Sequence, residues 1–186
     1  MDKQEIILIT ALRLFVENGF HGTPTSKIAK EAGVANGTLF HYYPTKEDLI
    51  VSLYLYIKSK MGKYIEEHVK PTNDTKEEFR SQFKAVMQWS MLNRNEFYYT
   101  QLFNTSPFAS LLSPEEVRKQ LKKSCDQIQD AVDKGVFKSC DVDFIHTIMG
   151  SHVFGLYSYL MKSKLSKSQQ QKVIDDSFEM LWGMLS

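Results

Sequence analysis

The sequence has few of the features that define several common classes of protein. Only two of its 186 residues are cysteine, and Cys125 and Cys140 match neither a disulfide framework nor a metal-ligand spacing. This excludes a disulfide-rich secreted scaffold and favours a reducing, cytoplasmic location. The N-terminus has only a brief apolar run beside acidic residues and no small-residue cleavage site, which argues against a secretory signal.

Long hydrophobic runs and an excess of charge are also missing. The longest stretch without Asp, Glu, Lys or Arg covers residues 144–161, and it contains two histidines and two glycines. About eighteen apolar residues is the lower limit for a membrane span, so we expect a buried core helix there and no membrane partner. The net charge of +1 neither invites nor excludes nucleic acid, so any contact with it must depend on a local arrangement.

Proline and glycine are sparse and punctuate segments in which apolar residues recur every three or four positions. This pattern predicts an all-α chain of about nine helices. The expected helices cover residues 3–18, 24–32, 36–43, 45–69, 75–92, 96–103, 114–134, 141 or 143 to 164, and 166–186. In the first of them, Ile6, Ile9, Leu12 and Phe15 are expected to form the apolar stripe.

Three helix starts carry a recognisable capping signal. Thr23 is expected to be an N-cap followed by proline at the first helical position. Thr75-x-x-Glu78 is expected to open a helix as a capping box, and Ser166-x-x-Gln169 is expected to cap the last helix.

The second and third helices are short, are joined by a tight turn and are braced by the first helix, which is the form of a helix-turn-helix. Gly33 supplies the positive φ of the turn, and Ala29 is small where the two helices cross. Ile28, Val34 and Leu39 are expected to point inward.

The residues left facing outward suit DNA. They are Ala35, Asn36, Gly37, Thr38, His41 and Tyr42. Asn can pair with an adenine edge, Gly lets the backbone approach, and hydroxyls and Lys46 can hold phosphates. Because residues 1–48 are nearly neutral, DNA binding would need two copies and a modest set of phosphate contacts. The alternative is a three-helix corner whose polar residues are merely solvated.

The run from Ile7 to Leu49 resembles the N-terminal domain of the tetracycline-repressor (TetR) family of transcription regulators. The resemblance rests on Ala-Leu-x-Leu-Phe, Gly-Phe-x-x-Thr, Ile-Ala-x-x-Ala-Gly-Val, and Gly-Thr-Leu followed by Lys-Glu-x-Leu. It covers about the first quarter of the chain. It implies a homodimer that binds a palindromic operator, usually as a repressor, and releases it when a small molecule enters the C-terminal domain.

The resemblance also implies roles for single residues. The positions at which the family contacts phosphates are Thr25, Thr38, Tyr42 and Lys46, and those at which it commonly meets bases are Ser26, Asn36, Gly37 and His41. This chain departs from the family at Phe40, where a phosphate-binding tyrosine is usual, so that hydroxyl is absent here.

The rest of the chain is rich in aromatic residues and methionine, which predicts a pocket for a small apolar or aromatic effector. The expected lining residues are Tyr64, Phe83, Met87, Trp89, Tyr98, Phe103, His146 and His152. For any one of them, a place in the core is the alternative.

The last two helices carry more apolar residues than one small domain needs, which predicts a four-helix bundle across a two-fold axis. The expected dimer-interface residues are Phe154, Tyr157, Phe178 and Trp182. An internal packing surface is the alternative. We therefore expect a DNA-binding domain over residues 1–48 and a ligand-binding and dimerisation domain over residues 49–186.

The sequence shows no catalytic motif, so an enzyme is not predicted. No His-Glu-x-x-His pair and no glycine-rich phosphate loop is present, and His146 and His152 lie on different sides of a helix. No cofactor and no metal is expected. The interpretation that remains beside a DNA-binding repressor is a helical adaptor or ligand-binding protein that does not bind DNA.

Overall fold

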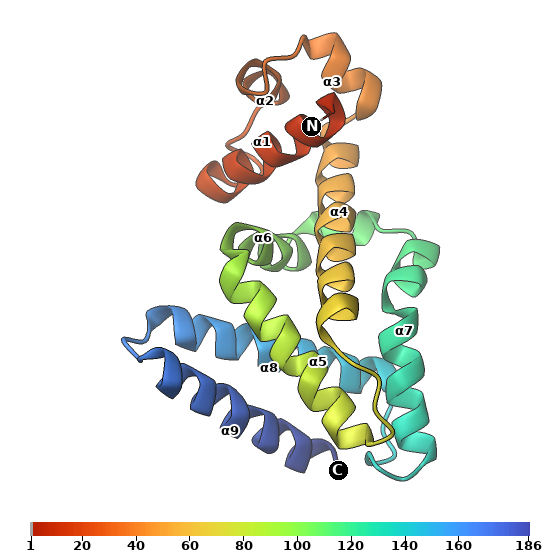
Figure 1. Cartoon of the computed structure of the whole chain (residues 1–186). Coiled ribbons are helices and arrows are strands. Elements are labelled where there is room, and N and C mark those ends of the chain that lie inside the picture. The colour runs from red at the N-terminus through yellow and green to blue at the C-terminus, as the bar shows by residue number, and fades with distance from the viewer. Residues whose placement is uncertain (1) are drawn as a thin grey trace. The chain divides into compact units, whose positions relative to one another are not determined.

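The computed structural model describes residues 2–186, with the side chains of all of these except Pro114, Val117, Arg118 and Gln120. The described residues form helices and no strand, so the predicted all-α fold is confirmed (Figure 1). The helices are α1 (Lys3–Asn18), α2 (Thr25–Glu31), α3 (Asn36–Tyr42), α4 (Lys46–His68), α5 (Thr75–Leu92), α6 (Arg94–Asn104), the 3₁₀ helix η1 (Pro107–Leu111), α7 (Pro114–Asp133), α8 (Val142–Lys162) and α9 (Lys167–Leu185).

Contacts within the chain divide it into two compact units. Unit 1 contains the residues up to Lys60 together with Asn93–Ser113, and unit 2 contains Met61–Leu92 and Pro114–Ser186. Helix α4 is continuous through the boundary between Lys60 and Met61. The predicted boundary between a DNA-binding domain (1–48) and a ligand-binding and dimerisation domain (49–186) is a boundary between functions, and it stays a prediction. No helix in the described part of the chain is both long and apolar enough to span a membrane.

Helix α1 is the brace of unit 1, and its buried stripe differs from the predicted one. Asp2 caps the helix, its carboxylate accepting a hydrogen bond from the Glu5 N–H at 2.8 Å. The buried side chains are Ile7, Leu8, Ala11, Leu12, Leu14 and Phe15. The prediction that Ile9 lies in the stripe is wrong, because the packed face of α1 is displaced by about one residue and leaves Ile9 exposed.

Thr23 is a second correction. It does not cap α2, which begins at Thr25 with Pro24 in the N-cap position. Thr23 is buried instead, and its hydroxyl lies within hydrogen-bond distance of two backbone oxygens, Leu14 O at 3.1 Å and Gly19 O at 2.8 Å. These oxygens are carbonyls at the C-terminal end of α1, where helices lack intrahelical partners. Thr23 therefore ties the end of α1 to the segment that leads into α2.

The turn between α2 and α3 is built as the sequence predicts. Gly33 has φ +67°, and its N–H donates to Lys30 O while the Val34 N–H donates to Ala29 O. This is the paired hydrogen-bond pattern of a Schellman cap, which needs the left-handed conformation that glycine adopts without strain. Ile28, Ala29 and Leu39 are buried, and α1, α2 and α3 pack against one another.

Helix α6 and η1 belong to unit 1, where α6 packs against α1. Four rings join these elements. Phe20 lies 5.3 Å from Phe15, 5.6 Å from Tyr99 and 5.1 Å from Phe108 between ring centroids. The Tyr99 hydroxyl donates to Ile50 O of α4 at 2.8 Å, and burial raises the pKa of Tyr99. This cluster connects the helix-turn-helix module to α4 and α6.

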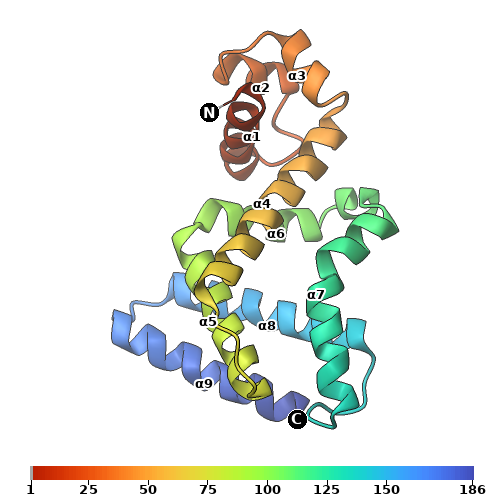
Figure 2. The same cartoon turned by 45° about the vertical axis from the view of Figure 1, so that its right-hand side comes forward.

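Unit 2 packs α5 and α7 against α8, and α5 and α8 against α9; both views show α8 and α9 side by side (Figure 2). Its interior is rich in aromatic rings. Ring centroids lie 5.7 Å apart for Phe83 and Phe178, 5.9 Å for Phe178 and Trp182, and 5.2 Å for Phe137 and Trp182.

The caps of unit 2 were predicted with one error. Helix α9 has the full capping box, with the Gln169 N–H donating to Ser166 Oγ and the Ser166 N–H donating to Gln169 Oε1. For α5 the cap is Asp74 rather than Thr75, because the Asp74 carboxylate accepts the Glu77 N–H at 3.2 Å. Asp is as good an N-cap as Thr, and here it stands one residue nearer the preceding loop.

Candidate nucleic-acid interface

The nine predicted DNA-binding residues all lie in unit 1 and all retain exposed surface. Thr25 and Ser26 open α2; Ala35, Asn36, Gly37, Thr38, His41 and Tyr42 form the start and outer side of α3; and Lys46 opens α4. The arrangement is what a helix-turn-helix presents to a major groove and its flanking phosphates.

Helix α3 is held by a single fully buried side chain. Leu39 is buried, and Tyr43, one turn later, is buried at the C-cap. At 100° per residue the opposite side of the helix carries Gly37 and His41, and both are exposed. A Cβ placed on Gly37 would meet no atom within 4 Å, so glycine leaves open space at the surface here rather than relieving a clash. A duplex backbone or base edge can approach α3 closely at this point.

The rings at the end of α3 contact each other. His41 and Tyr42 have centroids 5.5 Å apart in an edge-to-face arrangement, and Tyr42 lies 6.5 Å from Tyr43. Tyr43 is buried while Tyr42 and His41 are exposed, so the buried ring supports the two outer ones. Their polar tips are thereby held on the outer surface of α3.

Lys46 is more constrained than the sequence suggests. Its ammonium donates to Phe20 O at 2.5 Å, and partial burial lowers the pKa of Lys46. An ammonium has three donors, so two remain for a phosphate. The Phe20 carbonyl therefore holds the Lys46 side chain in place. Sequence reasoning missed this contact because residues 20 and 46 lie far apart along the chain.

Although residues 1–48 are nearly neutral overall, their charged side chains are unevenly paired. Arg13 pairs with Glu17 at 3.5 Å and with Glu31, which joins α1 to α2. The Arg13 guanidinium lowers the pKa of Glu31. Among the described residues, Lys27 and Lys30 of α2 are exposed and have no ion-pair partner. The single charge of Arg13 is therefore shared between two acidic groups, while two lysines on α2 stay available to phosphates.

The predicted effector residues are distributed over both units. Tyr98 and Phe103 belong to unit 1, where Phe103 is buried and stacks on Tyr54 at 4.1 Å while Tyr98 is exposed. In unit 2, Phe83 lies 6.0 Å from His152 between ring centroids, and Tyr64 stacks on His68 at 3.8 Å. Met87 and Trp89 of α5 are buried, and His146 is partly buried on α8.

His152 has its polar partners within unit 2. Its Nε2 lies 2.7 Å from Ser177 Oγ and 3.1 Å from Ser177 O, so the ring bridges α8 and α9. The predicted effector residues Phe83 and His152 therefore meet the predicted interface residues Phe178 and Trp182 in one cluster. Phe178 is 2% exposed, which places its ring in the core of unit 2.

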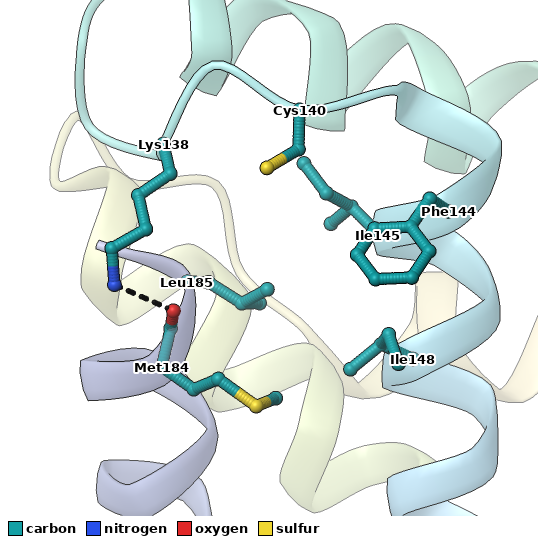
Figure 3. Close-up of a pocket in the computed structure, with 7 residues that line it drawn as sticks. All are labelled: Lys138, Cys140, Phe144, Ile145, Ile148, Met184 and Leu185. Atoms are coloured by element: carbon teal, nitrogen blue, oxygen red, sulfur yellow. Dashed lines mark hydrogen bonds between the residues drawn. The ribbon is translucent and has the colours of Figure 1, made fainter.

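A groove of about 170 Å³ opens in unit 2 where α8 begins and α9 ends (Figure 3). The lining residues are Lys138, Cys140, Phe144, Ile145, Ile148, Met184 and Leu185. Lys138 closes one side by donating from its ammonium to Met184 O at 2.8 Å. None of the eight predicted effector residues lines this groove.

The outer surfaces of α8 and α9 carry exposed apolar side chains. On α8 these are Phe144 and Tyr159, and on α9 Met180 and Met184, with Met180 72% exposed. Between the two α8 rings, Ser151 and Gly155 are small and exposed. The spacing 144, 148, 151, 155, 159 follows one helix face, on which the sequence-based dimer prediction included Phe144 but not Tyr159.

Sequence and structure comparisons identify the relatives of this chain. The profile of the bacterial regulatory proteins of the tetR family matches residues 7–53. A protein of the TetR transcription-regulator family from Shewanella sp. PV-4 has a solved structure that is 30% identical and superposes with a TM-score of 0.93, over 100% of this chain and 98% of that one.

Other relatives are more distant or match in part. The fatty acid metabolism regulator protein of Bacillus subtilis is 48% identical over 60 residues, which are 32% of this chain and 29% of that protein. The chain thus aligns with under a third of that relative's length. The structure of the B. subtilis regulator FadR in complex with stearoyl-CoA is 23% identical, with a TM-score of 0.74 over 98% of this chain and 99% of that one. With a full-length relative at 30% identity and the family profile on its helix-turn-helix, this chain belongs to the TetR family of DNA-binding transcriptional regulators.

Proposed function

We propose that the protein is a repressor that binds a palindromic operator as a homodimer and releases it when a small apolar or aromatic effector binds its C-terminal domain. The outer side of α3 carries this proposal, because Asn36, Gly37 and His41 are exposed together on a helix that Leu39 anchors. Asn36 pairs with an adenine edge, and Lys46 with the hydroxyls of Thr25 and Thr38 holds phosphates.

The proposal is tested first by fluorescence anisotropy of the protein with the duplex immediately upstream of its own gene. A scrambled duplex of equal length is the control, and both are titrated at two salt concentrations. Specific binding with a modest salt slope is expected, since residues 1–48 contain only five Lys and Arg residues, Lys3, Arg13, Lys27, Lys30 and Lys46. Equal, weak binding of both duplexes calls for selection from a random duplex library, and failure to enrich any sequence there would refute DNA recognition.

The substitution that best separates a regulator from a helical adaptor is Asn36→Ala. Asn36 is exposed at the start of α3, so its removal leaves the core of unit 1 intact. Operator affinity should fall by about tenfold to a hundredfold if the side chain reads a base, the usual value of one good base contact. Lys46→Met is a weaker test, because it also removes the hydrogen bond to Phe20 O.

The homodimer is proposed to form through the outer surfaces of α8 and α9. Phe144, Tyr159, Met180 and Met184 are exposed there, and Phe144 and Met184 also line the groove. Monomeric proteins rarely expose large contiguous apolar patches. The predicted residues Phe154 and Trp182 keep a place in this proposal beside the four exposed side chains, while Tyr157 and Phe178 are buried and support α8 and α9 from the inside.

Light scattering at micromolar concentration tests the dimer. The wild type should show twice the chain mass of 21.5 kDa, and Met180→Glu should shift the protein toward the monomer. Leu92→Glu is the matched control, since Leu92 is 68% exposed at the end of α5 in the same unit. A monomeric wild type would refute both the proposed dimer and the proposed binding to a palindromic operator.

The effector is proposed to lie among the aromatic and methionine side chains predicted above, with Tyr64, Phe83, Met87, Trp89, Tyr98, Phe103, His146 and His152 as the set. The stearoyl-CoA bound to FadR supports this, because that protein of the same fold holds a ligand with a long apolar acyl chain. Because α4 continues from unit 1 into unit 2, an effector that tilts α4 would change the separation of the two recognition helices. A compound that raises the melting temperature should therefore weaken operator binding, and unchanged DNA affinity would refute the coupling.

A further inference from the structure

One large apolar side chain on α3 is only partly covered by the protein. Phe40 is 44% exposed although its neighbour Leu39 is fully buried. Tyr42, two residues later, contacts both His41 and Tyr43, whereas no ring contact of Phe40 is found in the described part of the chain. Nearly half of this phenyl side chain is thus exposed on the recognition helix.

The position of Phe40 relative to Asn36 determines which base pairs the Phe40 ring can contact. The two residues are four apart, so they are neighbours on one side of α3, with Cβ atoms about 5–6 Å apart. Gly37 lies between them in sequence and has no side chain to fill the space beside the ring. Successive bases of a strand are stacked about 3.4 Å apart, so both side chains reach the same base pair or adjacent ones.

In the major groove the base edges offer hydrogen-bonding atoms and one kind of apolar group, the 5-methyl group of thymine. Asn pairs with adenine, whose partner is thymine. We propose that Phe40 reads thymine by packing its ring on the 5-methyl group in the base pair that Asn36 reads or in the next one. This inference rests on the proposed function, since it requires α3 to lie in the groove.

The test begins with the wild-type protein and a randomised duplex pool, from which the bound sequence is selected and refined to one high-affinity duplex. Each thymine of that duplex is then replaced singly by deoxyuridine, which removes only the methyl group. One position in each half-site should lose about fourfold in affinity, the value of one buried methyl, and replacement in both half-sites about sixteenfold.

The variant Phe40→Ala assigns the effect to the ring. It should bind the thymine and deoxyuridine duplexes equally, while Phe40→Leu should keep part of the difference. Ile9→Ala is the matched control, because Ile9 is 43% exposed on α1 of the same unit and has no place in the interface. It should leave both affinities unchanged, and thermal melting should show that all three variants are folded.

The outcomes separate the inference from the function beneath it. If the wild type selects no duplex, DNA recognition fails and the inference fails with it. If it selects a duplex but no deoxyuridine position matters, the function stands and thymine reading by Phe40 is refuted. An equal loss by Phe40→Ala on both duplexes would place the ring against the sugar-phosphate backbone, which also overturns the inference.

Discussion

Units 1 and 2 both consist of packed helices, but they place their exposed apolar side chains differently. In unit 1 these side chains are dispersed, with Ile9 on α1, Phe40 and Tyr42 on α3, Tyr98 on α6 and Leu111 on η1. In unit 2, Phe144, Tyr159, Met180 and Met184 belong to α8 and α9, while Leu92 lies apart from them at the end of α5. The exposed apolar side chains of unit 1 thus form no single patch, whereas those on α8 and α9 of unit 2 could form the dimer surface proposed above.

The two units also differ in the polar contacts that join their helices. Unit 1 uses buried hydrogen bonds, from the hydroxyls of Thr23 and Tyr99 to backbone carbonyls, beside one ion pair between helices, Arg13 to Glu31. Unit 2 joins α5 to α9 by ion pairs at the surface, Lys76 to Glu179 at 2.7 Å and Lys84 to Asp175 at 2.6 Å. A lost buried hydrogen bond leaves an unsatisfied group away from water, while a lost surface ion pair is resolvated.

The largest effect is expected from Phe15→Ala in unit 1. Phe15 is fully buried and contacts the rings of Phe20 and Tyr99. Its removal should lower the free energy of unfolding by about 3–5 kcal/mol, because transfer and cavity costs add. Urea denaturation followed by circular dichroism measures this loss. Phe40→Ala, at an exposed position of the same unit, should stay within about 0.5 kcal/mol, and equal losses would show that the core is not centred on Phe15.

Thr23→Val should follow, at about 1–3 kcal/mol. Valine keeps the shape of threonine but leaves buried carbonyls at the end of α1 with one partner fewer. Thr23→Ser retains the hydroxyl and should recover most of the loss in the same denaturation experiment. If serine and valine destabilise equally, the lost methyl packing rather than the hydrogen bonds explains the effect.

Local rules predicted the elements well, because helix ends are set by residues close in sequence. Gly33 and the Ser166–Gln169 box were both identified from spacing alone, and the structure shows the hydrogen bonds that the spacing implies. The outward set on α3 followed in the same way, since one buried residue, Leu39, orients a helix of two turns.

Contacts between distant residues were the part that sequence could not supply. Thr23 carries a good N-cap signal, yet its hydroxyl is taken by the end of α1. Phe178 and Met180 are both apolar residues of α9, and only packing against α5 decides that the first is buried and the second exposed. The Lys46 contact to Phe20 O has the same origin.

In unit 2, Ser166→Ala should cost about 1 kcal/mol, the usual value of an N-cap. The serine side chain accepts the Gln169 N–H, and alanine would leave that donor to water. Thermal melting measures the change. Lys167→Ala is the control, because Lys167 is the exposed first residue of α9 and its removal leaves the capping box intact.

The smallest effect should come from the ion pairs between α5 and α9. Hydrogen bonds from Lys84 and Lys76 lower the pKa of Asp175 and Glu179, respectively. Since each folded-state pKa lies below its unfolded value of about 4, the pairs stabilise the fold above that pH and lose their effect as the pH falls through the folded pKa. Glu31 of unit 1 titrates with the same sign, so the wild-type profile mixes both units.

The double variant Asp175→Asn, Glu179→Gln separates the two contributions. Its melting temperature should lie slightly below that of the wild type at pH 7, and the two should converge as the pH falls toward 3. The side chains of the Lys76–Glu179 and Lys84–Asp175 pairs are each 37–46% exposed, and Glu179 also pairs with Arg80 at 2.7 Å, so 1 M salt should also remove most of the difference at pH 7. A difference in melting temperature that persists at low pH and high salt would mean that packing of the two side chains, and not their charge, joins α9 to α5. The contrast between buried hydrogen bonds in unit 1 and surface ion pairs in unit 2 would then be wrong.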